Sequence, residues 1–552
     1  MFQPQRCRNK MIKKLIGFFV GIFFVLGANA GQIANLEFAH GYLAQIIQEQ
    51  GGGFAGGVTI GEINSANDPA TAINMEYLLC WIDMINAEAA GMTTDYCSSV
   101  YATKQVADTT AVVNALDNLI VWEYGSDFPF NITTTANTSS FSFKLAARGT
   151  FEVDWGDGPV QQITRSNTTQ ATYTHTYATA GQYTIGIRGT PTQYTTSWNV
   201  PDISFKSNTN IAAVSGSLGA LFPYLTGAGA ATPSTIIPKF TETFYGCTNL
   251  ATFPGDILDG LVIPAAEARV LPERMFKGMF QGIQNMTGSI PDDFFDGING
   301  MANNGYMFEQ MFYDCRALTG NIPQFRGITQ VNGAATFNKT FQNCYSITGF
   351  SGPLLPNARD SVPGQMAFFG TFDKATSLSE AIPNGFFGTF AGIGGSDTFS
   401  YAFRDTAIVR NLPGDLFAGL EGTCSSNMFN GMFNNCTGLT ADLPSGLFAD
   451  LTDITTNDGC FNSTFAGSGI TGIPDDLFGR LDIDPGRPPQ LNTSTFWKTF
   501  SLCKNLRGES LKIHGVPVWQ IWPAPADPNS VYQMYSRDDG LVDYGSIPAV
   551  YK

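Results

Sequence analysis

Histidine is almost absent from this chain of 552 residues, which contains only His40, His175 and His514. The three lie in unlike sequence contexts, and no Gly-x-Ser-x-Gly, zinc or phosphate-loop motif occurs with the context that would support it. Acidic residues are too numerous for a glycosidase pair to be nominated from sequence. We therefore expect a protein that is not an enzyme, with no catalytic residues, no metal site and no cofactor.

Charged residues are also scarce, at 14% of the chain, and acidic residues outnumber basic ones to give a formal net charge of −16. An acidic protein repels phosphate backbones, so nucleic acid is not an expected partner. With 43% hydrophobic residues, a chain of this length can bury large cores and is expected to form several domains.

Long apolar runs are missing except near the N-terminus. Five basic residues precede an apolar run from Leu15 to Leu26, and Ala28 and Ala30 supply small residues before a cleavage site. This pattern predicts a signal peptide over residues 1–30 and a secreted or cell-surface protein. The alternative is a membrane anchor, but the run has about 12 residues where a spanning helix needs roughly 20. No transmembrane segment is expected in the mature chain.

Residues 31–127 show mainly helical spacing of apolar residues and resemble no family that we recognise. Cys80 lies in one helical run and Cys97 just beyond it. In an exported protein this arrangement predicts a disulfide between the two cysteines, and two buried thiols are the alternative.

From residue 128 the apolar spacing changes to two. Phe141, Phe143 and Leu145 alternate with polar residues, and similar short runs follow at intervals marked by glycine-containing turns. The segment 128–204 is therefore predicted to be a small β-sandwich.

Three stretches stand out in this segment: residues 153–158 (Val-Asp-Trp-Gly-Asp-Gly), 175–177 (His-Thr-Tyr) and 181–185 (Gly-Gln-Tyr-Thr-Ile). Together they resemble the signature of polycystic-kidney-disease-type (PKD) domains. The resemblance implies an immunoglobulin-like sandwich that spaces or presents other domains on a cell surface, without catalysis.

Two carboxylates of this motif, Asp154 and Asp157, have the chemistry of calcium ligands. An Asp at such a turn also satisfies backbone amides by itself, and we favour that interpretation. His175, alone among strand residues, is interpreted as structural.

Phenylalanine pairs four residues apart recur nine times between residues 205 and 515. Successive first members are 29 to 36 residues apart, which is a period of stacked repeat proteins. Residues at i and i+4 share one face of a helix, so each copy is predicted to open with a short helix. In five copies a cysteine follows three residues later and continues that face. The pairs are Phe240/Phe244, Phe276/Phe280, Phe308/Phe312, Phe337/Phe341, Phe368/Phe372, Phe399/Phe403, Phe429/Phe433, Phe461/Phe465 and Phe496/Phe500.

After the phenylalanine pairs come an apolar residue and then an apolar residue joined to proline, as in Leu318 and Ile322-Pro323. Proline suits the end of a short strand, and a further apolar cluster after it predicts a second short helix. One such unit cannot bury its own aromatic face, whereas stacked units share a core.

The repeat cysteines recur singly, so we interpret them as small buried residues and not as metal or redox sites. Cys424 and Cys460 fall outside this column, one copy apart, and a bridge between neighbouring coils is an alternative for them.

Residues 307–318 and 428–439 match one another closely, as Met-Phe through Cys to Leu. With the repeat spacing, they resemble the BspA-like leucine-rich-repeat surface proteins. The resemblance implies a curved leucine-rich stack over residues 205–515 and a role in adhesion. Residues 516–552 are then expected to be a C-terminal cap or tail.

The predicted fold class is therefore multidomain α+β: a helical N-terminal region, an immunoglobulin-like (PKD-like) β-sandwich and a leucine-rich-repeat solenoid of about nine repeats. The expected function is that of an exported, adhesin-like surface protein that binds extracellular protein or glycan through the solenoid. The alternative is a self-assembling structural subunit of a surface layer or appendage. Candidate ligand-facing positions lie on the short predicted strands, where the absence of an aromatic platform favours protein slightly over glycan: Thr319, Asn321, Thr440, Asp442, Arg507 and Glu509.

Overall fold

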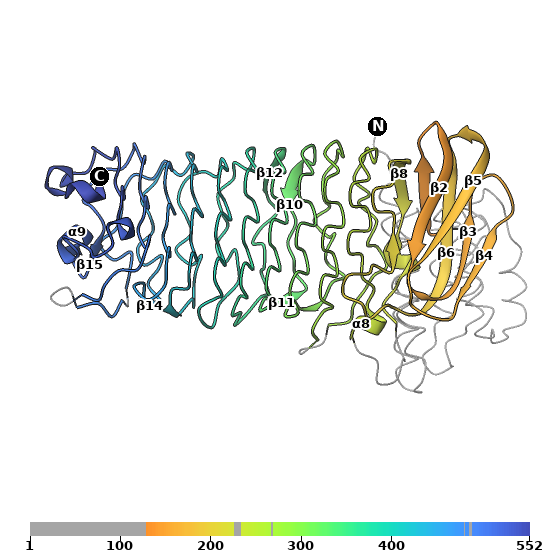
Figure 1. Ribbon diagram of the computed structural model, residues 1–552, viewed down its shortest axis with the longest axis horizontal. Helices are drawn as coiled ribbons and strands as arrows, with labels where there is room; N and C mark the ends of the chain where they lie inside the picture. The colour runs from red at the N-terminus through yellow and green to blue at the C-terminus, as the bar shows by residue number, and fades with distance from the viewer. Residues whose placement is uncertain (1–127, 226–232, 266–268, 480, 485–487) are drawn as a thin grey trace, which may run out of the picture. The chain divides into compact units, whose positions relative to one another are not determined.

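A computed structural model describes residues 128–552 except 226–232, 266–268, 480 and 485–487, and residues 130–552 form one unit (Figure 1). The predicted signal peptide, the predicted helical region 31–127 and the candidate Cys80–Cys97 disulfide lie outside the described residues. Those three predictions remain predictions.

Residues 130–216 form two antiparallel sheets. Apolar side chains point into a shared core from alternate positions, as in the pattern of buried and exposed residues along β2. The strand order is β4-β3-β6-β1-β8 in one sheet and β5-β2-β7 in the other. The strands are β1 (Phe130–Thr134), β2 (Thr138–Leu145), β3 (Arg148–Asp154), β4 (Gln161–Arg165), β5 (Ala171–Gly181), β6 (Thr184–Gln193), β7 (Ile203–Ser204) and β8 (Ile211–Gly216).

The core of the sheets continues into the repeats without a break. Phe205, just after β7, stacks on Phe244 of the first copy with ring centroids 5.4 Å apart. The buried carboxylate of Asp202 accepts hydrogen bonds from the backbone N–H groups of Thr195 (2.9 Å) and Lys239 (2.8 Å). Sheets and repeats are therefore joined by both packing and buried hydrogen bonds.

The predicted α+β fold class with a leucine-rich-repeat solenoid is wrong. The described residues contain small sheets, antiparallel in residues 130–216, and only four-residue α-helices and three-residue 3-10 helices. No phenylalanine pair lies in a helix, and the copies share only short parallel pairs instead of the continuous sheet of a solenoid. The helices are α7 (Leu218–Leu221), α8 (Pro233–Ile236), α9 (Val518–Ile521), η1 (Pro528–Ser530), η2 (Tyr544–Ser546) and η3 (Ala549–Tyr551); the remaining strands are β9 (Gly300–Met301), β10 (Gly320–Ile322), β11 (Ile328–Gln330), β12 (Ile347–Phe350), β13 (Gly422–Thr423), β14 (Leu451–Asp453), β15 (Lys512–Ile513) and β16 (Val516–Pro517).

The four-residue spacing of the phenylalanines comes from successive turns. In the copy at Phe308, every fourth residue (Tyr306, Gln310 and Asp314) has a φ between 54° and 63°. A left-handed residue in each tetrad is incompatible with an α-helix and costs about 1 to 2 kcal/mol when it is not glycine. The hydrogen bonds of the turns must offset this cost.

Backbone N–H groups of the turns alternate between two kinds of partner. The N–H of Met311 bonds to the carbonyl of Phe308 within its own turn (3.1 Å), whereas the N–H of Phe308 bonds to the carbonyl of Thr336 in the next copy (2.8 Å). The same alternation runs through the other copies, and it ties each copy to its neighbour. We call the successive turns that carry the two aromatic residues of every copy the turn ribbon.

The inward residues of the turn ribbon form continuous columns. The second phenylalanines stack almost parallel from copy to copy, as Phe280 does on Phe312, with centroids 5.6 Å apart. Each column cysteine donates its S–H to the carbonyl of the second aromatic residue in the preceding copy, as Cys315 does to Phe280 (3.1 Å). A threonine one residue before the second phenylalanine donates likewise to the first, as Thr340 does to Phe308 (2.9 Å). The Phe308 carbonyl also accepts the Met311 N–H, so the threonine supplies its second hydrogen bond and satisfies its own buried hydroxyl.

The repeat continues into a tenth copy after Pro517, where the sequence shows no phenylalanine. Val531 and Tyr535 occupy the two aromatic columns, and Tyr535 stacks on Phe500 at 5.8 Å. The ladder continues as well, because Phe500 N–H bonds to the Met534 carbonyl and Tyr535 N–H bonds to the Tyr551 carbonyl. Figure 1 shows this end of the stack beside α9 and β15.

Asp538 occupies the column position that cysteine holds in other copies, three residues after the second aromatic. It is 1% exposed, and neither carboxylate oxygen has a hydrogen-bond partner among the described residues. Burial raises the pKa of Asp538 to about 8, against a smaller lowering by the nearby Cys503 N–H, and Asp539 adds to the rise. A protonated carboxyl can donate a hydrogen bond as the thiols do, and an ionised one cannot.

This position predicts a stability that falls with rising pH. The folded-state pKa of Asp538 lies above its unfolded value, so its contribution is fully present below about pH 4 and is lost as pH rises through about 8. Replacement of Asp538→Asn removes the titration while keeping the shape. Urea unfolding at pH 4, 6 and 8 gives the free energy of unfolding of both proteins. Relative to the wild type, that of the variant should increase by on the order of a few kcal/mol from pH 4 to pH 8. Parallel pH profiles of the two proteins would contradict this assignment.

Candidate binding surface

The turn ribbon places four residues per copy outside the aromatic columns, at positions one, two, five and six after the first aromatic. Most of them are partly exposed, although some, such as Asp373 and Ser501, are buried. We number the ten copies from the one that begins at Phe240, and we call the surface formed by these positions in all ten copies the ribbon face. The interior columns repeat, but the combination of residues at the four outward positions differs from copy to copy. A constant frame with variable outward residues is the arrangement by which repeat proteins carry specificity.

In copies 1 to 6 each acidic residue of the ribbon face lies beside a basic side chain. Lys277 contacts Glu309 at 2.6 Å, and Arg404 contacts the buried Asp373 at 2.7 Å. Aromatic rings on this part of the face also carry a cation, as Tyr401 does beneath Arg404 at 4.4 Å. Internal pairing of this kind leaves little charge to attract a ligand.

Copies 7 to 10 have a different composition, and we call their outward residues the C-terminal patch. None of the sixteen is acidic, although the whole chain is strongly acidic. Trp497 and Tyr532 occupy the same column in neighbouring copies, and Tyr532 is 43% exposed. The patch consists of Asn430, Gly431, Asn434, Asn435, Asn462, Ser463, Ala466, Gly467, Trp497, Lys498, Ser501, Leu502, Tyr532, Gln533, Ser536 and Arg537.

The positions nominated from sequence lie on another edge of the coils, between the turn ribbon and the proline. Thr319 donates its hydroxyl to the Gly288 carbonyl (3.0 Å), and Asn321 lies in β10, which pairs with β12. Thr440 is exposed. At this edge the polar groups of Thr319 and Asn321 serve to join neighbouring copies.

The remaining three nominated positions are exposed and also make local contacts. Asp442 accepts the hydroxyl of Thr471 in the next copy (2.6 Å), and Arg507 donates to the Lys504 carbonyl (3.0 Å). Glu509 pairs with Lys512. Sequence reasoning missed the ribbon face because a helix was expected there, although the variable residues between the two phenylalanines were visible.

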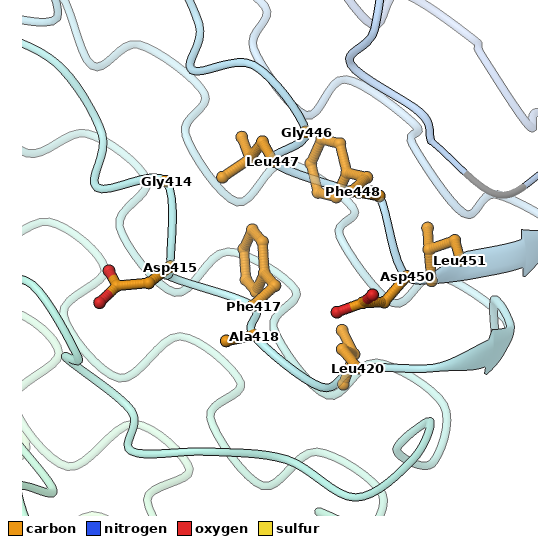
Figure 2. A pocket seen from close by; sticks show the side chains of 11 residues that line it. Gly414, Asp415, Phe417, Ala418, Leu420, Gly446, Leu447, Phe448, Asp450 and Leu451 are labelled. Atoms are coloured by element: carbon orange, nitrogen blue, oxygen red, sulfur yellow. The ribbon is translucent and has the colours of Figure 1, made fainter.

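One cavity of about 300 Å³ lies between copies 6 and 7, on the segment that follows the proline (Figure 2). Phe417 and Phe448 stack at its centre with centroids 5.4 Å apart. Its two carboxylates, Asp415 and Asp450, each accept a backbone N–H from the preceding copy, at 2.9 and 3.0 Å. These carboxylates therefore help to join neighbouring copies.

The column thiols are not poised for chemistry. Burial raises the pKa of Cys247, Cys436 and Cys503 to about 12 in each case, so these thiols stay protonated. Within the described part of the chain, no group of three or more His, Cys, Asp or Glu residues has the arrangement of a metal site.

The motif residues of the sheet region make local contacts. Asp154 accepts the Gly156 N–H at 2.9 Å, the turn role favoured from sequence. His175 stacks on Trp155, with centroids 5.2 Å apart, and pairs with Asp157 at 2.8 Å.

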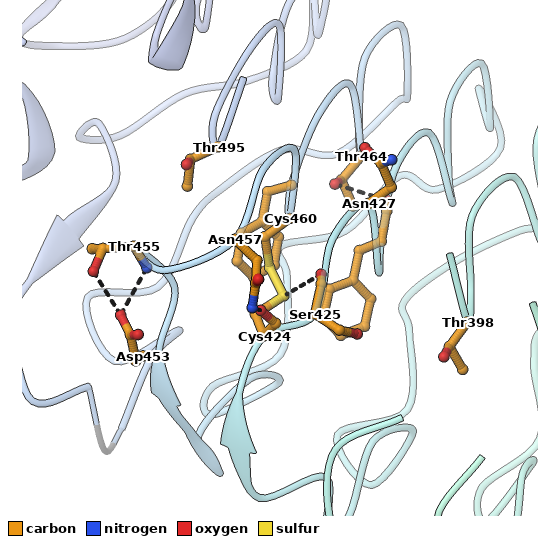
Figure 3. Close-up of a disulfide and its surroundings, with 12 residues drawn as sticks. Thr398, Cys424, Ser425, Asn427, Asp453, Thr455, Asn457, Cys460, Thr464 and Thr495 are labelled. Atoms are coloured by element: carbon orange, nitrogen blue, oxygen red, sulfur yellow. Dashed lines mark hydrogen bonds between the residues drawn. A yellow bond between two sulfur atoms is a disulfide. The ribbon is translucent and has the colours of Figure 1, made fainter. Parts of the chain in front are cut away.

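Cys424 and Cys460 form a disulfide between copies 7 and 8, across 36 residues of chain (Figure 3). Both residues are buried, and Asn457 donates to the Cys424 carbonyl at 2.9 Å. Disulfides persist in oxidising compartments. The disulfide covalently links neighbouring coils near the start of the C-terminal patch.

Reduction of this bridge is expected to destabilise the fold by roughly 3 to 4 kcal/mol, because it releases a loop of this length in the unfolded chain. Urea unfolding of the wild type with and without reductant measures the effect. A Cys424→Ala/Cys460→Ala variant should show the lower midpoint under both conditions, and a Cys344→Ala control should still respond to reductant. A wild-type midpoint unchanged by verified reduction would refute the expectation.

Among the described residues, no helix is both long and apolar enough to cross a membrane. No protein-family model matches the chain, and no match was found among curated proteins or solved structures.

Proposed function

We propose that the protein is an exported, non-enzymatic binding protein that acts at a surface in the manner of an adhesin, through its repeat region. The observation that carries this proposal is the contrast between interior and exterior of the turn ribbon. Ten copies keep the same buried columns and the same hydrogen-bond ladder, whereas the outward residues vary. Rigid coils that hold side chains in fixed register reduce the entropy lost on binding.

A catalytic function has less support. The described histidines are His175, which is held by Trp155 and Asp157, and His514, whose ring bonds to the Leu481 carbonyl at 2.8 Å. The repeat thiols are buried and protonated. These groups serve the fold.

The test uses the intact mature chain, because the core shared by sheets and repeats forbids a cut between them. Labelled protein is applied to an array of glycans and to immobilised collagen, fibronectin, laminin and mucin. We expect saturable retention on at least one surface. Trp497→Ala/Tyr532→Ala should reduce it at least roughly tenfold, as loss of aromatic anchors does. A Thr440→Ala/Glu509→Gln control on the other edge should not.

Two results would count against the proposal. Equal loss in the ribbon and edge variants would remove the binding role of the ribbon face. No saturable retention on any surface, together with ordered sheets or filaments of the purified protein in electron micrographs, would establish the alternative of a structural subunit.

A further inference from the structure

The composition of the C-terminal patch points to a class of ligand, and this inference rests on the proposed function. Its two ionisable groups at neutral pH are Lys498 and Arg537, both basic, in a chain whose net charge is −16. Acidic residues occur on the ribbon face in copies 1 to 6 and each contacts a cation there, as Glu309 contacts Lys277. Lys339 and Lys374 also lack a paired carboxylate among the described residues, but the C-terminal patch is the run of four successive copies whose ribbon-face positions include basic residues and no acidic one.

The cations of the patch are placed beside aromatic rings. Lys498 Nζ lies 4.6 Å from the centroid of the Trp497 ring, and the Lys498 N–H bonds to the Tyr532 carbonyl of the next copy at 3.0 Å. The backbone bond sets the register of the two rings, because Trp497 and Tyr532 stand at the same position in adjacent coils. Together they offer a rigid, amphipathic contact area with a cation beside it.

The rest of the patch is rich in amides and hydroxyls. Asn430, Asn462 and Gln533 lie on the corresponding turns of copies 7, 8 and 10. Each side-chain amide offers both hydrogen-bond donors and an acceptor. Asn430 donates one hydrogen to the Tyr401 hydroxyl at 3.1 Å, which orients its amide. Such groups match a ligand covered with hydroxyls, which exchange donor and acceptor roles freely.

We propose that the C-terminal patch binds a glycan chain whose sugar rings carry carboxylates. The apolar faces of the sugar rings pack on Trp497 and Tyr532, the amides bond to hydroxyls, and the carboxylates meet Lys498 and Arg537. Charge-assisted hydrogen bonds of this kind are stronger than neutral ones. An uncharged glycan would leave both cations without a counter-charge.

The spacing of the coils suits an extended chain. Adjacent hydrogen-bonded chains lie about 4.8 Å apart, and the first aromatics of copies 7 and 8 stack at 5.3 Å, those of copies 8 and 9 at 5.9 Å. A sugar unit of an extended polysaccharide advances by a similar distance. Four copies therefore contact a run of several consecutive sugars, which gives the patch many weak contacts that act together.

The test measures binding of the intact mature protein to polygalacturonate, alginate and hyaluronan by affinity electrophoresis and calorimetry. Each polymer is paired with its own carboxyl-reduced form, which keeps the sugars and removes the charge. We expect at least one carboxylated polymer to bind. The affinity for its carboxyl-reduced form should be lower by a factor of about ten or more. Dextran sulfate serves as a polyanion without carboxylates and should bind more weakly than the carboxylated polymer.

Variants divide the contributions. Lys498→Gln/Arg537→Gln should weaken binding roughly tenfold and flatten its dependence on salt, since charge contacts are screened. Trp497→Ala/Tyr532→Ala should weaken it by a similar factor with the salt dependence kept. Lys374→Gln, an exposed ribbon-face cation in copy 5, and Tyr544→Ala, an aromatic of copy 10 outside the ribbon face, are the matched controls and should change affinity less than about twofold.

The inference is overturned if none of the three carboxylated polymers binds, if the carboxyl-reduced form or dextran sulfate binds equally well, or if the controls lose as much as the patch variants. Failure of the inference differs from failure of the proposed function. Retention on immobilised protein or neutral glycan, lost in Trp497→Ala/Tyr532→Ala, keeps the binding function and changes the ligand class. Loss of all retention removes both.

Discussion

The hydrogen bonding of the turn ribbon is the constraint on which the rest of this structure depends. Every second N–H closes a turn within its own copy, and the alternate N–H groups reach the next copy. In several copies, two carbonyls of the turn ribbon accept a further hydrogen bond from a side chain of the next copy. A cysteine thiol serves the second aromatic position and a threonine hydroxyl the first. The Cys and Thr side chains therefore find buried acceptors, because each carbonyl oxygen has a second lone pair beyond the one that its turn uses.

This arrangement separates stability from recognition. The inward residues of each turn must fit the buried columns. One residue in every four must also adopt a left-handed conformation, and residues as different as Gln310, Lys339 and Tyr401 occupy that position. Most outward positions are partly exposed and lie outside the aromatic columns, so their chemistry can differ between copies. The C-terminal patch uses that freedom, with aromatic, amide and basic residues on a frame whose neighbouring coils are also joined by the Cys424–Cys460 bridge.

The end of the stack shows what happens when the interior rule is relaxed. In copy 10 a tyrosine replaces the second phenylalanine and Asp538 replaces the thiol. Tyr535 keeps the stacking and gives its hydroxyl a partner, the Leu511 N–H at 3.0 Å. Asp538 keeps the column position, but its buried carboxyl gains a raised pKa in exchange for the neutral thiol. The terminal coil therefore makes a contribution to stability that responds to pH near neutrality.

Spacing alone predicted that nine copies exist, which side chains are buried and where the copies begin, because burial of a phenylalanine pair in every copy imposes a period on the sequence. It did not distinguish a helix from a run of four-residue turns, since both place residues i and i+4 on one face. Only the tertiary structure decided between them, through positive φ angles at positions such as Gln310 and bonds to the neighbouring copy that no single copy can make. The tenth copy, with Val531 and Tyr535 in place of phenylalanine, could not be found from the spacing. It is recognised as a copy by its backbone hydrogen bonds to copy 9 and not by its residue types. The candidate surface followed the same division, because Thr319 and Asp442 were nominated from an assumed strand face, whereas the face exposed by the turn ribbon exists only once neighbouring coils have stacked.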